Sequence, residues 1–292
     1  MKELNSEIGR ENKLQIPYVE QKLGKLLLDA GKLAPADAEK ILRLQKSDNL
    51  RFGDAAVKLG LVTESDIRYA LAQQFDYPYL SSGEGGFSPE LTAAYSPFSP
   101  QVDQLRALRS QLMLRWFAFG HKSLSVVGAQ RNDGVSSLAA NLAVVFSQLG
   151  ERTLLIDADL REPRQHAIFN LGSRQGLSDI LIGRAELTAA IRIPSFVGLS
   201  VLTAGTIPPN PAELLSRLGV VSLLNSYKEY FDVILVDTSP GTFSETATIC
   251  LRTEGALIAA RQDYTKVGDI SALANNLNET GVSVVGTVLN QF

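Results

Sequence analysis

The sequence predicts an α/β fold: a doubly wound, mostly parallel sheet with a phosphate-binding loop (P-loop), preceded by a small helical repeat domain. Three observations lead to this prediction. Six short apolar runs between residues 124 and 289 alternate with helical patterns, as expected for strands buried on both faces. The first run leads into the stretch GAQRNDGVSS, which opens an apolar helix. Nearer the front, residues 22–45 and 51–74 repeat one pattern.

Composition narrows the class of protein. The chain has 292 residues and a formal net charge of -3, so it lacks the basic footprint of a protein that binds nucleic acid. Its one cysteine, Cys250, lies in an apolar stretch and excludes a disulfide framework. The polar N-terminus has no signal-peptide pattern, and no uncharged apolar run reaches the ~18 residues of a membrane helix. We therefore expect a cytoplasmic protein without direct membrane insertion, recruited to the inner membrane by a partner.

The two repeat copies align with a shift of 29 residues. Each copy predicts a helix, a glycine stop and a second helix, which starts at Pro35 in the first copy and at Thr63 in the second. Thr63 and Asp66 have the spacing of a capping box. The matched pairs are Lys22/Arg51, Gly24/Gly53, Leu28/Val57, Gly31/Gly60, Leu42/Leu71 and Gln45/Gln74.

The repeat resembles the N-terminal domain of type II secretion and pilus ATPases, one branch of which binds cyclic di-GMP. Arginine can bind a phosphate or guanine with two parallel hydrogen bonds, and glycine lets backbone N–H groups approach a phosphate. Lys22 lacks the planar guanidinium, and Phe52 replaces the leucine of the family pattern. The alternative is a helical docking domain whose glycines are helix C-caps. The candidate cyclic di-GMP-binding residues are Lys22, Leu23, Gly24, Gly31, Gln45, Arg51, Phe52, Gly53, Gly60 and Gln74.

Residues 81–100, SSGEGGFSPELTAAYSPFSP, are rich in glycine, serine and proline and predict a linker. The expected domains are thus a tail at 1–19, the repeat domain at 20–80, this linker, and a P-loop domain at 101–292.

The six predicted strands of the P-loop domain bring the polar candidates to one edge. Since ligands bind beyond the carboxyl ends of such strands, residues just after the strands are the site candidates. The P-loop follows the first strand, the pair Asp157 and Asp159 follows the second, and Asp237 ends the fourth. The strands are expected at Leu124–Val127, Thr153–Asp157, Leu199–Thr203, Val233–Asp237, Ala256–Ala260 and Val282–Leu289, with helices such as Ser137–Leu149 and Pro211–Tyr227 between them.

Four motifs resemble the bacterial tyrosine kinases of polysaccharide export, in the P-loop group of MinD and ParA. They are LLIDADLR, ILVDTSP, the proline-rich GTIPPNPAELL and the helical DQLRALR. Together with the repeat, they resemble the exopolysaccharide chain-length determinant tyrosine kinases called EpsG. The resemblance implies Mg-ATP or Mg-ADP as cofactor, with Asp157, Asp159 and Asp237 as catalytic carboxylates and Ser136, Asp159 and Asp237 as Mg²⁺ ligands. It also implies a Wzz-like membrane chain-length determinant as partner.

The same resemblance implies a homo-oligomer that packs through Asp103, Arg106 and Arg109. From spacing alone, these three charges lie along one helix face, and a solvated face is the alternative.

The P-loop departs from a working one at its cation. Gly134, Ser136 and Ser137 are in place as nucleotide-binding residues, but Val135 replaces the lysine and Gln130 takes the alternative lysine position. Asp133 adds a negative charge where phosphates are expected, and Arg131 is the one local cation. A unit charge at about 4 Å contributes about 4 kcal/mol at an effective dielectric constant near 20. We therefore expect weak nucleotide binding and inefficient phosphoryl transfer.

Three functions compete. The favoured one is a regulatory pseudokinase of exopolysaccharide synthesis and export, responsive to cyclic di-GMP or docked on a partner through the repeat. The second is an active tyrosine autokinase in which Arg131 replaces the lysine, although the given sequence ends VVGTVLNQF without the tyrosine cluster of such kinases. The third, a positioning ATPase like MinD, conflicts with the missing lysines and the proline-rich segment.

Overall fold

The computed structural model describes residues 17–74, 80, 83–241 and 244–291, with the backbone alone at 17–22, 65, 69 and 72–74. The chain forms two compact units, residues 1–77 and residues 78–292. The helices of the first unit are α1 (Pro17–Asp29), α2 (Pro35–Asp48), α3 (Phe52–Lys58) and α4 (Glu64–Gln74).

The repeat unit has the capping pattern that its sequence predicts. In the first copy, Lys32 N–H bonds the carbonyl of Leu27 and Gly31 N–H bonds that of Leu28, which is a Schellman motif. In the second copy, Gly60 and its successor make the same two bonds. Gly31 and Gly60 both have φ of +66°, which glycine adopts without strain. The reciprocal bonds between Thr63 and Asp66 confirm the capping box. Both copies therefore end their first helix by one mechanism.

The other two repeat glycines are packing positions. A Cβ atom on Gly24 would lie 3.2 Å from the ring of Phe52, and one on Gly53 would lie 3.3 Å from Ile67. Leu23, Leu27 and Phe52 belong to the buried core of this unit. Gly24 thus packs against the second copy, whereas Gly53 packs within its own copy.

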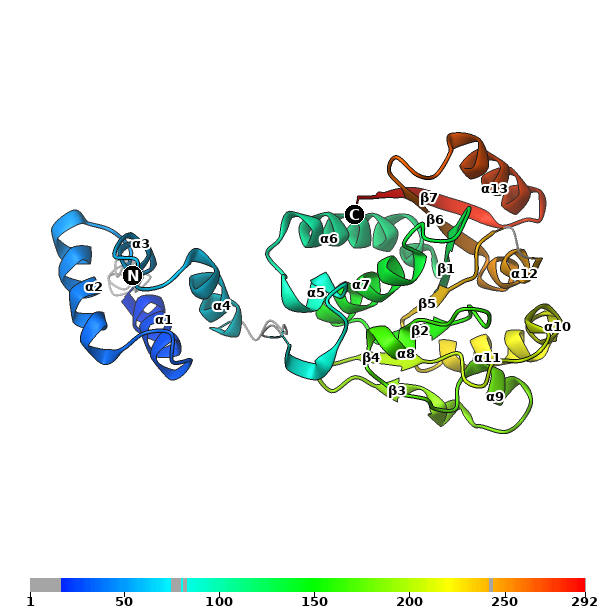
Figure 1. Cartoon of the computed structure of the whole chain (residues 1–292), viewed down its shortest axis with the longest axis horizontal. Helices are drawn as coiled ribbons and strands as arrows, with labels where there is room; N and C mark the ends of the chain where they lie inside the picture. The colour runs from blue at the N-terminus through cyan, green and yellow to red at the C-terminus, as the bar shows by residue number, and fades with distance from the viewer. Residues whose placement is uncertain (1–16, 75–79, 81–82, 242–243, 292) are drawn as a thin grey trace, which may run out of the picture. The chain divides into compact units, whose positions relative to one another are not determined.

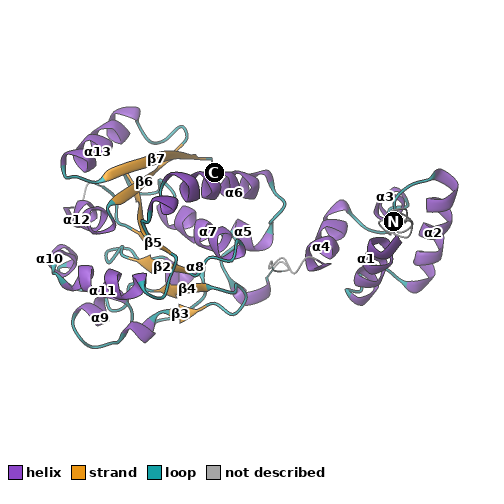
Figure 2. Cartoon of the chain, turned by 180° about the vertical axis from the view of Figure 1, so that it is seen from behind, coloured by secondary structure: helices purple, strands orange, loops and turns teal. Residues whose placement is uncertain are grey.

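The second unit is a seven-stranded sheet between two layers of helices (Figure 1). The strand order is β3-β4-β2-β5-β1-β6-β7, so β7 and β3 form the two edges (Figure 2). Every neighbouring pair is parallel except β3 with β4. The strands are β1 (Ser123–Gly128), β2 (Thr153–Asp157), β3 (Ile191–Arg192), β4 (Leu199–Leu202), β5 (Val233–Asp237), β6 (Gly255–Arg261) and β7 (Ser283–Asn290).

The helices of the second unit separate onto the two faces of the sheet (Figure 1). On one face lie α5 (Thr92–Tyr95), α6 (Pro100–Arg115), α7 (Val135–Gln148) and α8 (Gln165–Ile168). On the other lie α9 (Leu177–Leu181), α10 (Pro211–Ser216), α11 (Gly219–Lys228), α12 (Ser244–Thr253) and α13 (Val267–Glu279). Short 3₁₀ helices span Glu84–Gly86, Phe117–Phe119 and Leu187–Ala189.

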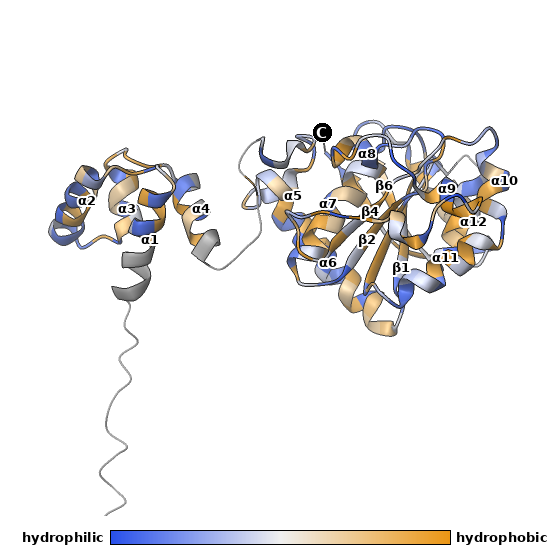
Figure 3. Cartoon of the chain, turned by 90° about the horizontal axis from the view of Figure 1, so that it is seen from below, coloured by the Kyte–Doolittle hydropathy of each residue, from blue (hydrophilic) through white to orange (hydrophobic). Residues whose placement is uncertain are grey.

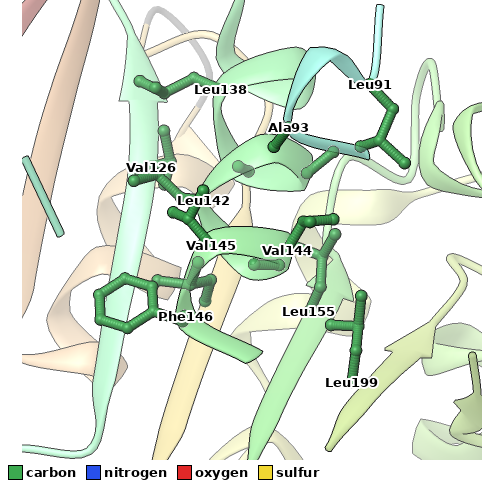
Figure 4. Packing of buried hydrophobic residues seen from close by; sticks show 14 of the residues in the cluster. Leu91, Ala93, Val126, Leu138, Leu142, Val144, Val145, Phe146, Leu155 and Leu199 are labelled. Carbon is green, nitrogen blue, oxygen red and sulfur yellow. The ribbon is translucent and has the colours of Figure 1, made fainter. Parts of the chain in front are cut away.

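Both faces of the sheet are apolar, because the strands carry consecutive apolar residues and successive residues point to opposite sides. On β2, Leu155 packs with α7 while Leu154 and Ile156 pack with the opposite layer. The strands are accordingly hydrophobic along their length in Figure 3. In Figure 4, Leu142 and Phe146 of α7 lie against the sheet beside Val126 of β1. This packing fixes α7, and with it the P-loop that precedes it.

The predicted doubly wound, mostly parallel sheet is confirmed, with two local differences. The predicted helix Pro211–Tyr227 is two helices, α10 and α11, because Arg217 takes an extended φ/ψ of -65° and 150°. The two-residue antiparallel strand β3 was not predicted, since two residues carry no periodicity.

Residues 83–100 differ from the predicted linker, because they pack on the P-loop domain. Leu91, Ala93 and Ala94 are fully buried in the cluster that contains α7, and Figure 4 shows Leu91 and Ala93 beside that helix. The amide N–H of Ala93 donates to Asn141 of α7 over 2.8 Å. Glycine, serine and proline here form tight turns over a core, so composition alone does not separate such a segment from a linker.

No helix in the described part of the chain is long and apolar enough to cross a membrane.

If residues 83–95 are part of the domain, Leu91→Ala should lower its free energy of unfolding by about 2–5 kcal/mol, since a fully buried leucine is truncated. Urea unfolding followed by the fluorescence of Trp116, the one tryptophan of the chain, reports on this unit alone. The matched control is Leu114→Ala, whose side chain is 67% exposed and should change stability by less than about 0.5 kcal/mol. Equal effects of the two variants would show that the segment adds nothing to the core.

Candidate functional site

The P-loop connects β1 to α7 at the centre of the sheet. Gly134 is the N-cap of α7 and has φ of +85°, in the left-handed region that glycine favours. Asn132 has φ of +65°, a region that asparagine tolerates. The loop lies at the carboxyl edge, because β1 pairs with β5 and β5 pairs with β2. Three sequence motifs therefore meet where a doubly wound sheet binds its ligands.

Two acidic residues lie side by side in this edge. Asp157 and Asp237 are register partners on β2 and β5, and both are fully buried. Burial raises the pKa of both carboxyls, to about 7 for Asp237, and for Asp157 the charge of its neighbour raises it further. In each carboxyl, Oδ1 has no hydrogen-bond partner among the described residues. Two such groups require a proton or a cation between them.

Gln165 links the acidic pair to the P-loop. Its backbone N–H donates to Asp157 Oδ2 over 2.9 Å, and its side-chain Nε2 donates to Asp237 Oδ2 over 2.8 Å. The same Nε2 donates to the carbonyl of Ser136 over 3.0 Å. Gln165 is fully buried. None of the sequence motifs predicts it, although it follows the acidic end of the second predicted strand by a few residues, within the stretch DADLREPRQ.

Asp159 holds the turn after β2. Its Oδ1 accepts hydrogen bonds from the backbone N–H groups of Arg161 and Glu162 and from the Ser239 hydroxyl at 2.7 Å. This turn places Asp159 close enough to Asp237 to raise the pKa of that residue. The predicted carboxylates are thus brought together, with Asp159 half-buried at the rim.

The donor set suits Mg²⁺, which prefers oxygen ligands. Ser136 faces the carboxyl of Asp237, and its hydroxyl lowers the pKa of that carboxyl. The Oδ1 atoms of Asp157 and Asp237 lack partners, so oxygens remain for a cation. Among the described residues, no cluster of three or more His, Cys, Asp or Glu forms a protein-only metal site. A Mg²⁺ ion here would therefore keep water and phosphate oxygens in its shell, as Mg²⁺ commonly does.

Val135, at the lysine position, packs against the main core cluster. A Cβ atom on Gly128 would lie 2.8 Å from its Cγ2, so the strand and the start of α7 are in close contact here. The partly buried valine therefore adds apolar contact at the start of α7 instead of a cation.

Asp133 was expected to lie among the phosphates, but the structure buries it within the loop instead. Its Oδ2 accepts from the Gln130 N–H at 3.0 Å, and its Oδ1 accepts from the Thr265 hydroxyl at 2.6 Å. Its carbonyl accepts from Asn290 Nδ2 at 2.7 Å. Asp133 thus ties the P-loop to the segment after β6 and to the end of β7, and these donors satisfy its buried carboxyl.

The arginines around the site are held by carboxylates. Arg131, the expected substitute for the lysine, forms an ion pair with Glu162. Arg164 Nη2 donates to Glu90 Oε1 over 2.6 Å. Glu90 also accepts a hydrogen bond from the hydroxyl of Ser137, one of the expected nucleotide-binding residues. Both arginines and the Ser137 hydroxyl therefore have a carboxylate of this chain as partner.

The predicted oligomerisation residues lie on α6. Arg106 pairs with Asp103 at 2.8 Å on the same helix. Arg109 points into the domain, where its Nη1 donates to the Val145 carbonyl of α7 over 2.7 Å. Asp103 is exposed. The three residues therefore divide between the helix surface and an internal contact.

Of the predicted cyclic di-GMP-binding residues, some are accessible at the surface of the repeat unit and others are buried in it. Arg51 is exposed at the N-cap of α3, and there is open space around Gly31 and Gly60. Gln45 is half-buried. Leu23, Gly24 and Phe52 are buried, and Gly53 is half-buried beneath Ile67. The side chains of Lys22 and Gln74 lie outside the described residues.

A cavity of about 740 Å³ lies away from this site. Its lining includes Arg152, which precedes β2, and Gly198, which precedes β4, so it opens at the amino ends of the strands. Tyr227 and Tyr230 also line it, but no motif residue does. The candidate site therefore lies at the P-loop and not in this cavity.

Comparison with known proteins gives one consistent group. The chain is 31% identical over 197 residues to CapB of Staphylococcus aureus, described as a tyrosine-protein kinase, and covers 86% of it. It is 33% identical over 199 residues to the tyrosine-protein kinase Etk of Escherichia coli, but spans 27% of that protein. It is 30% identical to a protein described as a tyrosine-protein kinase in the cps region of Klebsiella pneumoniae, of which it spans 31%.

The solved kinase domain of Escherichia coli Etk superposes with a TM-score of 0.66, over 69% of this chain and 79% of that domain, at 32% identity. No protein-family model matches the chain.

Asp237→Asn should make the domain more stable relative to the natural chain as the pH rises. In the folded state the pKa of Asp237 is about 7, so the carboxyl keeps its proton up to that pH. In the unfolded chain an aspartate has a pKa of about 3.9 and loses the proton there. The folded state therefore loses stability between these values, by up to about 1.4 kcal/mol per pH unit. Urea unfolding without Mg²⁺, followed at Trp116, should show this gain from pH 5 to pH 8.

The matched control is Asp269→Asn, which neutralises an exposed acid on α13 and should leave the pH slope unchanged. A parallel slope for Asp237→Asn would mean that Asp237 is ionised in the folded domain throughout this range.

Proposed function

Because this chain belongs to the bacterial tyrosine-protein kinases that include CapB and Etk, we propose that it is a regulatory member of that family. It acts in exopolysaccharide synthesis and export, binds Mg-ATP or Mg-ADP weakly and transfers the phosphoryl group poorly. The observation that carries the proposal is Val135, a partly buried apolar side chain that packs against the core where the family's P-loop motif has lysine.

Charge decides how large the loss is. A lysine at about 4 Å from a phosphate contributes about 4 kcal/mol at an effective dielectric constant near 20, or about a thousandfold in affinity. Arg131 forms an exposed ion pair with Glu162, so a phosphate would have to displace Glu162 to use this cation. The alternative of an active autokinase that uses Arg131 therefore gains no support from this geometry.

The remaining residues account for residual binding. The loop at Gly134 and the first turn of α7 offer backbone N–H groups to an anion. Ser136, Asp159 and Asp237 would hold Mg²⁺, which supplies positive charge beside the phosphates. Gln165 positions the acidic pair and the serine through its three hydrogen bonds. The oxygen ligands for Mg²⁺ are present, but the P-loop lacks its cation. This combination supports nucleotide binding without efficient phosphoryl transfer.

Assembly follows the family in this proposal. The chain associates with copies of itself through α6, where Asp103 and Arg106 form the surface pair, and it docks on a membrane chain-length determinant that recruits it to the inner membrane. The name of the relative from the cps region of Klebsiella pneumoniae supports a role in a polysaccharide locus.

We also propose the repeat unit as the input, with cyclic di-GMP as its ligand. Arg51 is exposed, and the two left-handed glycines leave open space in which a phosphate can approach the backbone. The Schellman motifs support the alternative equally, because both glycines already act as helix caps.

Val135→Lys should raise the affinity for Mg-ATP by about a hundredfold or more, because it restores a cation to an otherwise assembled site. Val135→Met is the matched control, since it adds length without charge. Isothermal titration of the natural chain and both variants measures the effect. If Val135→Lys binds no better than Val135→Met, the loss of affinity does not lie in the missing cation, and the proposal fails.

Cyclic di-GMP should bind the natural chain and lose at least about tenfold in affinity with Arg51→Ala, since a paired charged hydrogen bond contributes on the order of 1.5–3 kcal/mol. Arg43→Ala removes another exposed arginine of the same unit and should leave the affinity unchanged. Titration that detects no binding to the natural chain would restrict the repeat to docking.

A further inference from the structure

We propose that Glu90 is an autoinhibitory anion that occupies the phosphate end of α7 and competes with the nucleotide. This inference rests on the proposed function, because it concerns the same nucleotide site. Its origin is a segment that the sequence predicts as a linker and that the structure places on the P-loop helix. The missing cation and the competing anion are thus separate causes of weak binding.

The carboxylate of Glu90 engages two groups that a phosphate would use. One oxygen, Oε2, accepts from the hydroxyl of Ser137, and the other, Oε1, accepts from Arg164 Nη2 at 2.6 Å. The Ser88 hydroxyl also donates to Oε1, over 3.0 Å. Both oxygens are therefore satisfied by donors of the site and of its own segment.

The position of Ser137 explains why this contact matters for a nucleotide. Ser137 is the third residue of α7, whose first turn carries free N–H groups and the positive end of the helix dipole. An anion is stabilised there, and a carboxylate competes with a phosphate for the same donors. Arg164 is also close enough to Asp237, one of the proposed Mg²⁺ ligands, for its charge to lower the pKa of that carboxyl. While Glu90 holds it, its charge is not available to a phosphate.

The backbone around Glu90 is fixed to α7 by Asn141, one turn after Ser137. Asn141 Nδ2 donates to the carbonyl of Glu90 over 2.8 Å, and its Oδ1 accepts from the Ala93 N–H at the same distance. Leu91, between them, is fully buried. The carboxylate is therefore held in place before any ligand arrives.

Release is nevertheless feasible, because the Glu90 side chain keeps 30% of its surface exposed. It can rotate toward solvent without opening the core beneath Leu91.

The test is the affinity for Mg-ADP of Glu90→Gln, which keeps the shape and removes the charge. It is measured by titration in the natural chain and in the Val135→Lys background. We expect about tenfold tighter binding in either background, because a negative charge next to the phosphate is removed. Glu279→Gln is the matched control, because it removes an exposed charge at the far end of α13. In a Ser137→Ala background the gain should shrink, since one of the two contested donors is gone.

The outcomes separate this inference from the proposed function. Unfolding followed at Trp116 first verifies that Glu90→Gln is folded. If Val135→Lys binds Mg-ADP tightly and Glu90→Gln adds nothing, Glu90 is a structural staple and the inference fails, while the proposed function stands. If neither the single variants nor their combination binds, Glu90 does not gate the site, and both fail. If Glu90→Gln binds Mg-ADP about tenfold more tightly but the natural chain transfers the phosphoryl group efficiently, the proposed function fails alone, whereas tight binding by the natural chain overturns both.

Discussion

The site depends on two buried carboxyl groups held side by side. Asp157 and Asp237 end neighbouring strands, and the register of the parallel pairing places them directly beside each other. Like charges at such a distance in a buried setting are unstable, so each requires a proton, a donor or a cation. Gln165 supplies two of the donors, its backbone N–H to Asp157 and its side-chain amide to Asp237. The side-chain amide also donates to the carbonyl of Ser136 in the P-loop. One glutamine thereby fixes the relative positions of both acidic strand ends and the first turn of α7.

The same region shows how a P-loop keeps its shape without its cation. Val135 is partly buried and packs against the core, so apolar contact holds the start of α7. The loop itself is held by Asp133, whose carboxylate and carbonyl join Gln130, Thr265 and Asn290. These bonds stabilise the loop independently of any phosphate. The loop is therefore held in shape without a ligand, as the proposed regulatory role requires.

How much of this the sequence predicts depends on the range of each interaction. The Schellman glycines and the capping box at Thr63 involve residues a few positions apart, so their spacing predicts them directly. The ends of β1, β2 and β5 follow from apolar runs and from the rule that parallel strands end at one edge. Gln165 and Glu90 act through long-range contacts, and neither residue belongs to the quoted motifs. The segment 83–100 was misjudged for the same reason, since turn residues look alike over a core and over solvent.

The most direct test of the account is phosphoryl transfer by the unmodified chain. The full chain is incubated with Mg-ATP labelled at the γ-phosphate, and phosphotyrosine is quantified over time by mass spectrometry beside a sample given Mg-ADP. With Val135 packed against the core at the lysine position and Arg131 paired with Glu162, we expect no phosphotyrosine above the Mg-ADP sample. Phosphotyrosine that accumulates with time and requires Asp237 would contradict it, because the site would then transfer phosphate without the cation that its P-loop lacks.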